Sequence, residues 1–121
     1  MSRVEDLNRV LRKLQSDSAG IEASALISED GRMIANAVAP SMEESRVAGM
    51  AATLLSLGTR AAAELRHGGM REVIVGGELG YVVLMSAGCG ALLLAMTSEI
   101  DKLGLIYFNM QEAIRGVQKI L

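Results

Sequence analysis

A long stretch of low charge, from Met42 to His67, most constrains what this chain can fold into. It is long enough for about seven helical turns, and no charged residue lies between Arg46 and Arg60. Apolar side chains, most of them large, recur along it at the spacing of a core-facing helix. They are Val47, Met50, Leu54, Leu57, Ala61 and Leu65. We therefore expect a long helix that packs this stripe against the core.

A second stripe of smaller side chains lies roughly 100° around the same helix. It consists of Ala48, Ala51, Leu55, Gly58 and Ala62. Small residues allow a second backbone to approach closely, and a large apolar patch left in water usually marks an interaction site. We therefore predict that this stripe forms a dimer interface with a second copy of the chain.

The size and composition of the chain favour one globular domain, which we expect to span residues 1–121. The apolar fraction of 50% with 21% charged residues is too hydrophobic for disorder. No apolar run approaches the roughly 18 to 20 residues that a membrane span needs, so direct membrane insertion is not expected. The N-terminal residues mix charges and lack a secretory signal pattern. Together with the single Cys89, this favours a cytoplasmic location.

Nucleic acid is disfavoured as a partner. The formal net charge is −2, so the chain has no basic footprint for a phosphate backbone. Its aromatic residues are two Tyr and one Phe, which is few for stacking on bases.

Periodicity and turn signals predict the order α-β-β-α-β-β-β-α. Apolar spacing predicts helices at about 3–16 and 101–121, and extended segments are expected at 21–28, 32–39, 71–75, 81–86 and 91–97. The first hairpin turns at Glu29-Asp30-Gly31. A capping box of Ser41 and Glu44 is expected to start the long helix, and His67-Gly68-Gly69 to end it. The fold class is therefore α/β (α+β), with one antiparallel five-stranded sheet covered by helices on both faces.

Residues that could carry catalysis are sparse. His67 has no Cys, Asp or Glu at ligand spacing, and Cys89 lies in a glycine-flanked turn without a recognisable base. The glycines form no phosphate-binding motif and lie between strands, as turn glycines do. We therefore predict no catalytic residue, no metal site and no cofactor, and hence that the chain is not an enzyme. A small-ligand pocket lined by some of the eight methionines, such as Met50, Met85, Met96 and Met110, stays an alternative.

A sparse polar stripe on the long helix is the remaining functional candidate. It consists of Arg46, Gly49, Thr53, Ser56 and Arg60, with His67 further along. An ordinary solvated face is usually denser in Lys and Glu. Two such helices side by side would instead form a flat platform of short side chains with a few arginines. That arrangement favours docking of another protein.

The chain resembles the Roadblock/dynein light-chain family. The resemblance rests on the hairpin Ala25-Leu-Ile-Ser-Glu-Asp-Gly-Arg-Met-Ile-Ala35, on Gly58 to Gly69, on Val73-Ile-Val-Gly-Gly-Glu-Leu-Gly-Tyr-Val-Val-Leu84 and on Leu103-Gly-Leu105. It covers nearly the whole chain. It implies a profilin-like sandwich that homodimerises by antiparallel pairing of the long helices and of the third strands. The apolar run Val73, Ile74 and Val75 in the third strand agrees with that pairing, because exposed apolar edge strands tend to pair.

Members of this family are usually non-enzymatic regulators or scaffolds of Ras-like small GTPases, and others are light chains of dynein. The compact form of this chain is similar to the prokaryotic regulators. The resemblance therefore implies a homodimer that binds a Ras-like small GTPase on its paired long helices. A pure assembly module, as in motor light chains, and a small-ligand sensor are the alternatives.

Overall fold

The computed structural model describes residues 2–18, 20–37, 42–98 and 103–121. Its elements follow the predicted order: α1 (Arg3–Asp17), β1 (Ile21–Ser28), β2 (Met33–Ala37), α2 (Glu44–Glu64), β3 (Glu72–Gly77), β4 (Gly80–Gly88), β5 (Ala91–Thr97) and α3 (Leu103–Ile120). The strands form one five-stranded sheet in the order β2-β1-β5-β4-β3, and all neighbours are antiparallel. The predicted fold class is confirmed.

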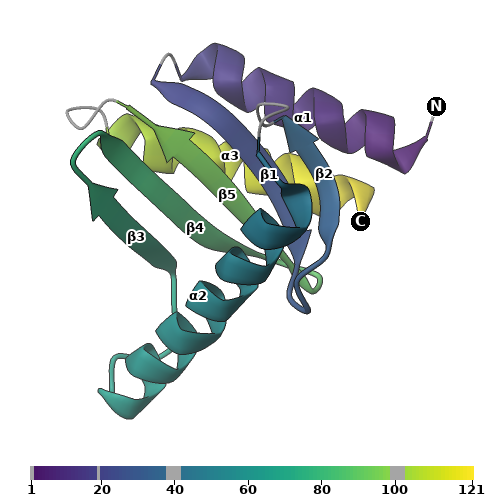
Figure 1. The fold of residues 1–121 in the computed structure, drawn as a ribbon. Coiled ribbons are helices and arrows are strands. Elements are labelled where there is room, and N and C mark those ends of the chain that lie inside the picture. Colours follow the sequence, from purple (N-terminus) through teal and green to yellow (C-terminus); the bar gives the residue numbers. More distant parts are fainter. Residues whose placement is uncertain (1, 19, 38–41, 99–102) are drawn as a thin grey trace.

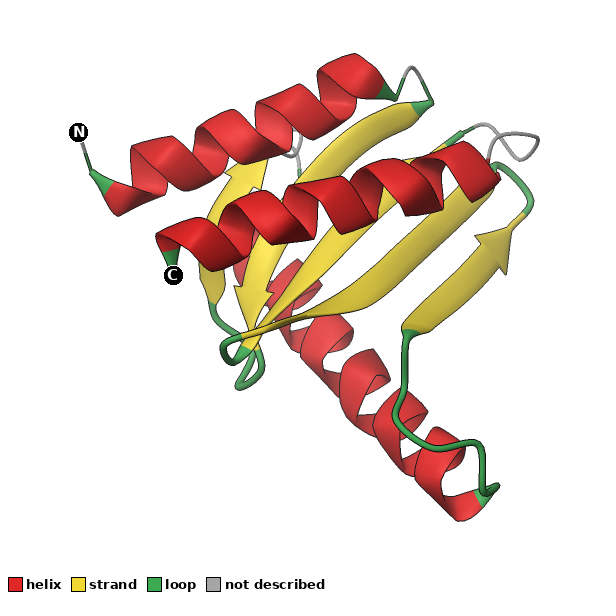
Figure 2. Ribbon diagram, turned by 180° about the vertical axis from the view of Figure 1, so that it is seen from behind, coloured by secondary structure: helices red, strands yellow, loops and turns green. Residues whose placement is uncertain are grey.

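Helices cover both faces of this sheet. α1 and α3 lie side by side on one face (Figure 2), and α2 crosses the other face. The sheet is apolar on both sides for this reason, and the central strand β5 is buried from Ala91 to Ala95. One apolar core lies beneath α1 and α3, and a second lies beneath α2.

α1 shows how the sequence builds one of these layers. Leu7, Leu11 and Leu14 share one helical stripe and are at most 2% exposed. Ser2 caps the helix, since its hydroxyl accepts a hydrogen bond of 3.1 Å from the backbone N–H of Glu5. The apolar stripe therefore faces the sheet and the charged residues face water.

α2 is rotated relative to the prediction. Ala48, Ala51 and Leu55 are buried beneath it against the sheet of the same protomer, at 0%, 2% and 7% exposure. Assigning these three residues to a dimer interface is therefore wrong. Small side chains here let the helix backbone lie close to the strands.

The large stripe of α2, predicted to face the core, lies instead to the side of the covered face. Met50, Leu57 and Leu65 are 56%, 55% and 69% exposed. Val47 and Leu54 are partly buried and pack against the core beneath the helix. Periodicity placed the residues in two stripes correctly, but the choice of which stripe is covered was wrong.

The ends of α2 also differ from the sequence signals. The helix begins at Glu44 and Glu43 is its N-cap residue, without a side-chain capping bond, while Ser41 lies outside the described residues. The helix ends before the glycines, because Arg66 adopts a φ of 61°. The His67 N–H then donates to the carbonyl of Ala62 at 2.8 Å, and Arg66 N–H to that of Ala63 at 3.1 Å. This is a Schellman ending with arginine at the position that glycine usually takes.

The two edges of the sheet differ. β2 is short, its pairing with β1 shifts register between Leu26 and Ile27, and α1 packs beside it. β3 pairs with β4 without a register shift, and from Ile74 to Gly77 its residues are exposed. Gly76, Gly77 and Gly80, predicted to lie in a loop, belong to the strands, because a turn of only two residues joins β3 to β4.

Candidate partner-binding site

α2 exposes two chemically different surfaces on either side of its buried face. The first, here called the polar flank, consists of Gly49, Thr53, Ser56 and Arg60, all of which are exposed. The second, here called the apolar flank, consists of Met50, Leu54, Leu57 and Leu65, of which Leu57 lies at the border with the polar flank. Beyond the sheet, the C-terminal half of the helix extends past the start of β3 (Figure 1). Much of α2 is therefore open to a partner.

The polar flank adjoins the turn between β1 and β2. A hollow of about 440 Å³, here called the turn hollow, separates them. Its lining residues are Glu29, Asp30, Gly31, Gly49, Ala52, Thr53, Ser56 and Leu57. The turn lies close to the helix: a Cβ placed on Gly31 would be 3.7 Å from the Cβ of Ala52 and 3.8 Å from the Cα of Gly49, which are ordinary contact distances. Glycine suits position 31 because its φ of 89° is a conformation that other residues rarely adopt.

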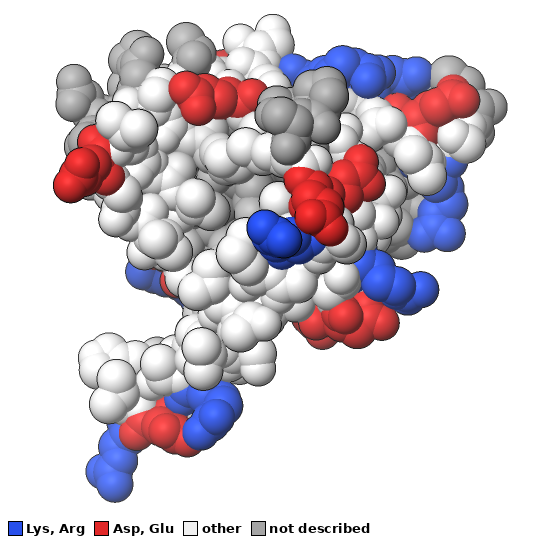
Figure 3. Space-filling view, in the orientation of Figure 1, with Lys and Arg blue, Asp and Glu red and all other residues white. Residues whose placement is uncertain are grey.

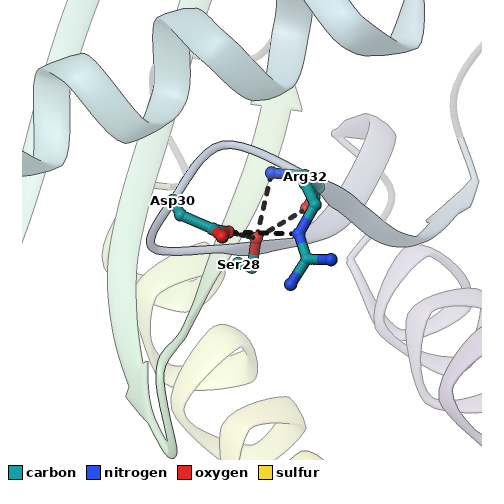
Figure 4. Close-up of polar contacts among 3 residues, drawn as sticks. All are labelled: Ser28, Asp30 and Arg32. Atoms are coloured by element: carbon teal, nitrogen blue, oxygen red, sulfur yellow. Dashed lines mark hydrogen bonds and ion pairs between the residues drawn. The ribbon is translucent and has the colours of Figure 1, made fainter.

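The turn itself is held by a small polar network (Figure 4). The Ser28 hydroxyl donates to the Asp30 carboxylate and accepts from the backbone N–H of Arg32 at 2.9 Å. The Arg32 Nε lies 3.4 Å from the same carboxylate. The Ser28 hydrogen bond, helped by the nearby arginine, holds the pKa of Asp30 below its usual value. Asp30 therefore presents a fixed negative charge at the rim of the turn hollow.

The two arginines of the predicted polar stripe lie apart from this hollow. Arg46 lines a different depression and lies 3.8 Å from Glu43. Arg60 is one to two turns beyond Ser56 and lies 3.5 Å from Glu64. Both pairs are exposed, so each contributes little to stability and leaves its arginine accessible. The structure thus brings Gly49, Thr53 and Ser56 together with the turn and leaves the arginines at either side.

The apolar flank borders a cleft of about 550 Å³ between α2 and the sheet, here called the apolar cleft. From the helix it is lined by Met50, Ala51 and Leu54, and from the sheet by Val75, Val82, Leu94 and Met96, with Glu43 and Arg46 among the remaining residues. Figure 3 shows a largely uncharged surface along α2 and over β3. An exposed apolar surface of this kind usually marks an interaction site.

Gly58 and Ala62, predicted for the dimer interface, are only half-buried and lie where α2 leaves the sheet. A Cβ on Gly58 would lie 2.6 Å from the Cγ2 of Val73 and 2.8 Å from the Sδ of Met70, so this glycine is needed for packing within the protomer. A further hollow of about 640 Å³, here called the end hollow, lies beside it. It is lined by Gly58, Ala61, Ala62, His67, Gly69, Met70, Arg71, Glu72 and Val73.

The residues with reactive side chains are not gathered into a site. His67 is exposed and its Nδ1 lies 2.7 Å from the carbonyl of Leu65. Cys89 is an exposed free thiol in the turn between β4 and β5. Within the described ranges, no three His, Cys, Asp or Glu side chains are grouped to hold a metal ion. In the same part of the chain, no helix has the length and hydropathy needed to cross a membrane.

Sequence reasoning missed Glu29 and Asp30 as part of a candidate site. The Asp-Gly signal correctly predicted a turn there, but a turn signal is local and does not say which helix the turn approaches.

Comparisons with known proteins agree on the family and the fold. A family model described as the Roadblock/LC7 domain matches residues 7–97. An uncharacterized protein of Methanocaldococcus jannaschii is 30% identical over 112 residues, which cover 93% of this chain and 96% of that protein.

Solved structures extend the agreement to three dimensions. A Roadblock/LC7 domain from Streptomyces avermitilis matches with a TM-score of 0.86 at 19% identity, covering 93% of this chain and 94% of that one. Myxococcus xanthus MglB matches with a TM-score of 0.88 at 16% identity, covering 99% and 90%. The fold similarity reaches profilin IA of Acanthamoeba castellanii, with a TM-score of 0.66, 12% identity and coverage of 94% and 98%. The predicted profilin-like sandwich is thus confirmed, and the chain belongs to the Roadblock/LC7 domain family.

Proposed function

We propose that this chain is a non-enzymatic, cytoplasmic homodimer that regulates or scaffolds a Ras-like small GTPase, which it binds through α2. The observation that carries this proposal is the division of α2 into three faces. One is buried on its own sheet, one is apolar and exposed, and one is polar and lies beside the β1–β2 turn. One helix can therefore hold its protomer, a second copy and another protein at the same time.

The apolar flank is the surface proposed for the second copy. It continues through the apolar cleft to the exposed strand β3, where Ile74 and Val75 are 43% and 41% exposed. Of the residues predicted for the interface, Gly58, Ala62, Val73, Ile74 and Val75 stay in the proposal. Met50 and Leu57 replace the buried alanines, because they are the large apolar side chains that a dimer would remove from water.

The polar flank is the surface proposed for the GTPase, together with Arg46, which lies between this flank and the rim of the apolar cleft. Its hydroxyls and arginines suit a hydrated protein surface better than a helix partner. In a two-fold dimer each helix presents this series in opposite directions. A single asymmetric GTPase lying across the axis would use different residues of each protomer, giving two chains per GTPase.

The small-ligand sensor is kept as a second candidate because the apolar cleft has the size of a small-molecule site. A ligand bound there would raise the melting temperature with its concentration. In the dimer proposed here the partner protomer covers the cleft, so the same ligand would also shift the dimer equilibrium.

The GTPase proposal is tested by the double change Arg46→Glu with Arg60→Glu. The partner is a Ras-like small GTPase loaded with a non-hydrolysable GTP analogue. We expect association to slow about tenfold at low salt, and the difference to shrink as salt rises, because exposed charges act mainly on the rate of encounter. Arg12→Glu with Lys119→Glu is the matched control, since it makes the same change in net charge on α1 and α3.

Binding that is equally affected by both pairs of changes would contradict the assignment to α2. Nucleotide turnover of the GTPase then separates two roles. A regulator changes the rate of turnover, and a pure assembly module leaves it unchanged.

A further inference from the structure

The turn between β3 and β4 determines which backbone groups face the open edge of the sheet. Gly77 pairs with Gly80, so Glu78 and Leu79 alone form the turn. In a two-residue hairpin the closing pair exchanges both backbone hydrogen bonds, and such pairs recur at every second residue. The odd-numbered residues of β3 therefore direct their N–H and C=O groups toward β4. The even-numbered residues Glu72, Ile74 and Gly76 direct theirs outward.

These outward groups favour one register for a second β3 strand related by a two-fold axis. When Ile74 faces the partner's Ile74, Glu72 faces the partner's Gly76, and every outward residue of the strand has a partner. On the α2 face, Val73 then lies opposite the partner's Val75. The pairing thus joins apolar side chains and places no like charges opposite each other.

The two neighbouring registers would pair the strands less favourably. An axis through Val75 places Glu72 opposite the partner's Glu78, a like-charge pair. An axis through Val73 pairs Glu72 with the partner's Ile74, but Gly76 then faces Met70, which lies outside the strand. Of the three registers, only the one centred on Ile74 therefore pairs every outward-facing residue of β3 without a like-charge contact.

The same register brings the tip of the hairpin to a particular place on the partner. Leu79 is 91% exposed, the most exposed of the large apolar side chains in the described residues. It lines a depression at the end of the sheet with Val75, Val82 and Met96 of the α2 side and with Tyr81 and Thr97 of the other side, so a partner can reach it from the α2 side. Continuing the register beyond the strand places Leu79 opposite the partner's Gly69.

Gly69 lines the end hollow, which also lies on the α2 side. The hollow is lined mainly by small or apolar residues, together with His67, Arg71 and Glu72; the small or apolar ones are Gly58, Ala61, Ala62, Gly69, Met70 and Val73. When two copies pair in this register, the exposed leucine of one protomer lies at the open hollow of the other. Within one protomer, the leucine and the hollow lie at opposite ends of β3.

We propose that Leu79 of each protomer inserts into the end hollow of the other, with the two β3 strands paired about Ile74. This inference rests on the homodimer proposed above and specifies its register. It gives the half-buried Gly58 and Ala62 a second role, because side chains any larger would fill the hollow that receives the leucine.

The register is tested with single cysteines in a Cys89→Ser background. Ile74→Cys, Val73→Cys and Val75→Cys are each exposed to a glutathione redox buffer. The Cα atoms of facing hydrogen-bonded residues are about 5.5 Å apart, within the range of a disulfide. In the proposed register, Val73 and Val75 each lie roughly 8 Å from their own copy, too far for a bridge. We expect Ile74→Cys to form a covalent dimer at least tenfold faster than the other two.

The outcomes separate the register from the dimer itself. Faster bridging at Val73→Cys or Val75→Cys would overturn the proposed register. A reduced protein that sediments as a dimer but bridges at none of the three positions would place the interface away from β3 and overturn the insertion. A protein that sediments as a monomer would overturn the homodimer proposal as well.

The leucine is tested by Leu79→Asp, which keeps a residue suited to a turn. We expect the dissociation constant of the dimer to rise at least tenfold, with the circular dichroism spectrum unchanged. Leu105→Asp is the control, since Leu105 is 52% exposed on α3, on the other face of the sheet. An equal effect of the two changes, or none from Leu79→Asp, would overturn the insertion.

Discussion

At the residue scale, the end of α2 departs from the usual preference for glycine at a left-handed φ. Arg66 adopts a left-handed φ of 61° where glycine is preferred, while Gly68 and Gly69 follow two residues later. The side chain of a non-glycine residue raises the free energy of this conformation by about 1 kcal/mol. Glycines in the sequence therefore predicted the region in which the helix ends but missed the residue at which it turns.

Replacing this arginine is expected to stabilise the fold. Arg66→Gly relieves the unfavourable φ, and the greater freedom of glycine in the unfolded chain offsets part of the gain. We expect the free energy of unfolding to rise by about 0.5 kcal/mol. Arg60→Gly, inside the same helix, is the control and is expected to lose about 1 kcal/mol. Urea denaturation at one fixed protein concentration measures both, and a loss in Arg66→Gly would contradict the explanation.

At the element scale, periodicity predicted the elements and the residues on each face of α2, because both follow from local spacing. It could not tell which stripe meets the sheet. Ala48 and Ala51 are weakly hydrophobic, so hydrophobicity alone favoured Met50 and Leu57 as the core. The outcome depends on how close the helix backbone must lie to strands that already carry Ile27, Leu84 and Leu92, which is a property of the tertiary packing.

Alanine substitutions at two glycines of α2 distinguish the effect of tertiary packing from that of helix propensity. Gly49→Ala adds a Cβ in open space, so we expect a gain of up to about 1 kcal/mol in the free energy of unfolding. Gly58→Ala places its Cβ 2.6 Å from the stiff side chain of Val73, and we expect a net loss of about 1 kcal/mol or more. Thermal or urea denaturation distinguishes them. Equal gains in both variants would show that Val73 and Met70 move aside without cost.

At the scale of the whole molecule, the candidate site depends on contacts between distant segments. The sequence correctly grouped Gly49, Thr53 and Ser56, because they share a stripe of one helix. It could not add Asp30, which reaches that stripe only after β1 and β2 have joined the sheet. Likewise, the exposed strand β3 becomes an edge only through the order of the five strands.

The apolar flank is expected to determine whether the molecule is a dimer. Met50→Glu places a charge on this flank at the rim of the apolar cleft, where dimer formation would have to remove it from water. We expect sedimentation at micromolar concentration to shift from dimer toward monomer while the helical content stays constant. Val4→Glu, at a side chain 49% exposed on α1, is the control. A Met50→Glu protein that stays as dimeric as the control would show that the apolar flank of α2 is not part of the interface.

The two edge strands of the sheet differ, and this difference limits how many protomers could join through strand pairing. Pairing through β3 leaves β2 at both ends of the joined sheet, and β2 is a five-residue strand with an irregular register beside α1. Short, irregular edges resist the addition of further strands. A sheet with two smooth edges could polymerise into a fibre, whereas the proposed pairing through β3 would end at the dimer. In the proposed dimer, one edge strand pairs with the partner and the other resists pairing. This difference between the edges favours a closed dimer over an open-ended aggregate.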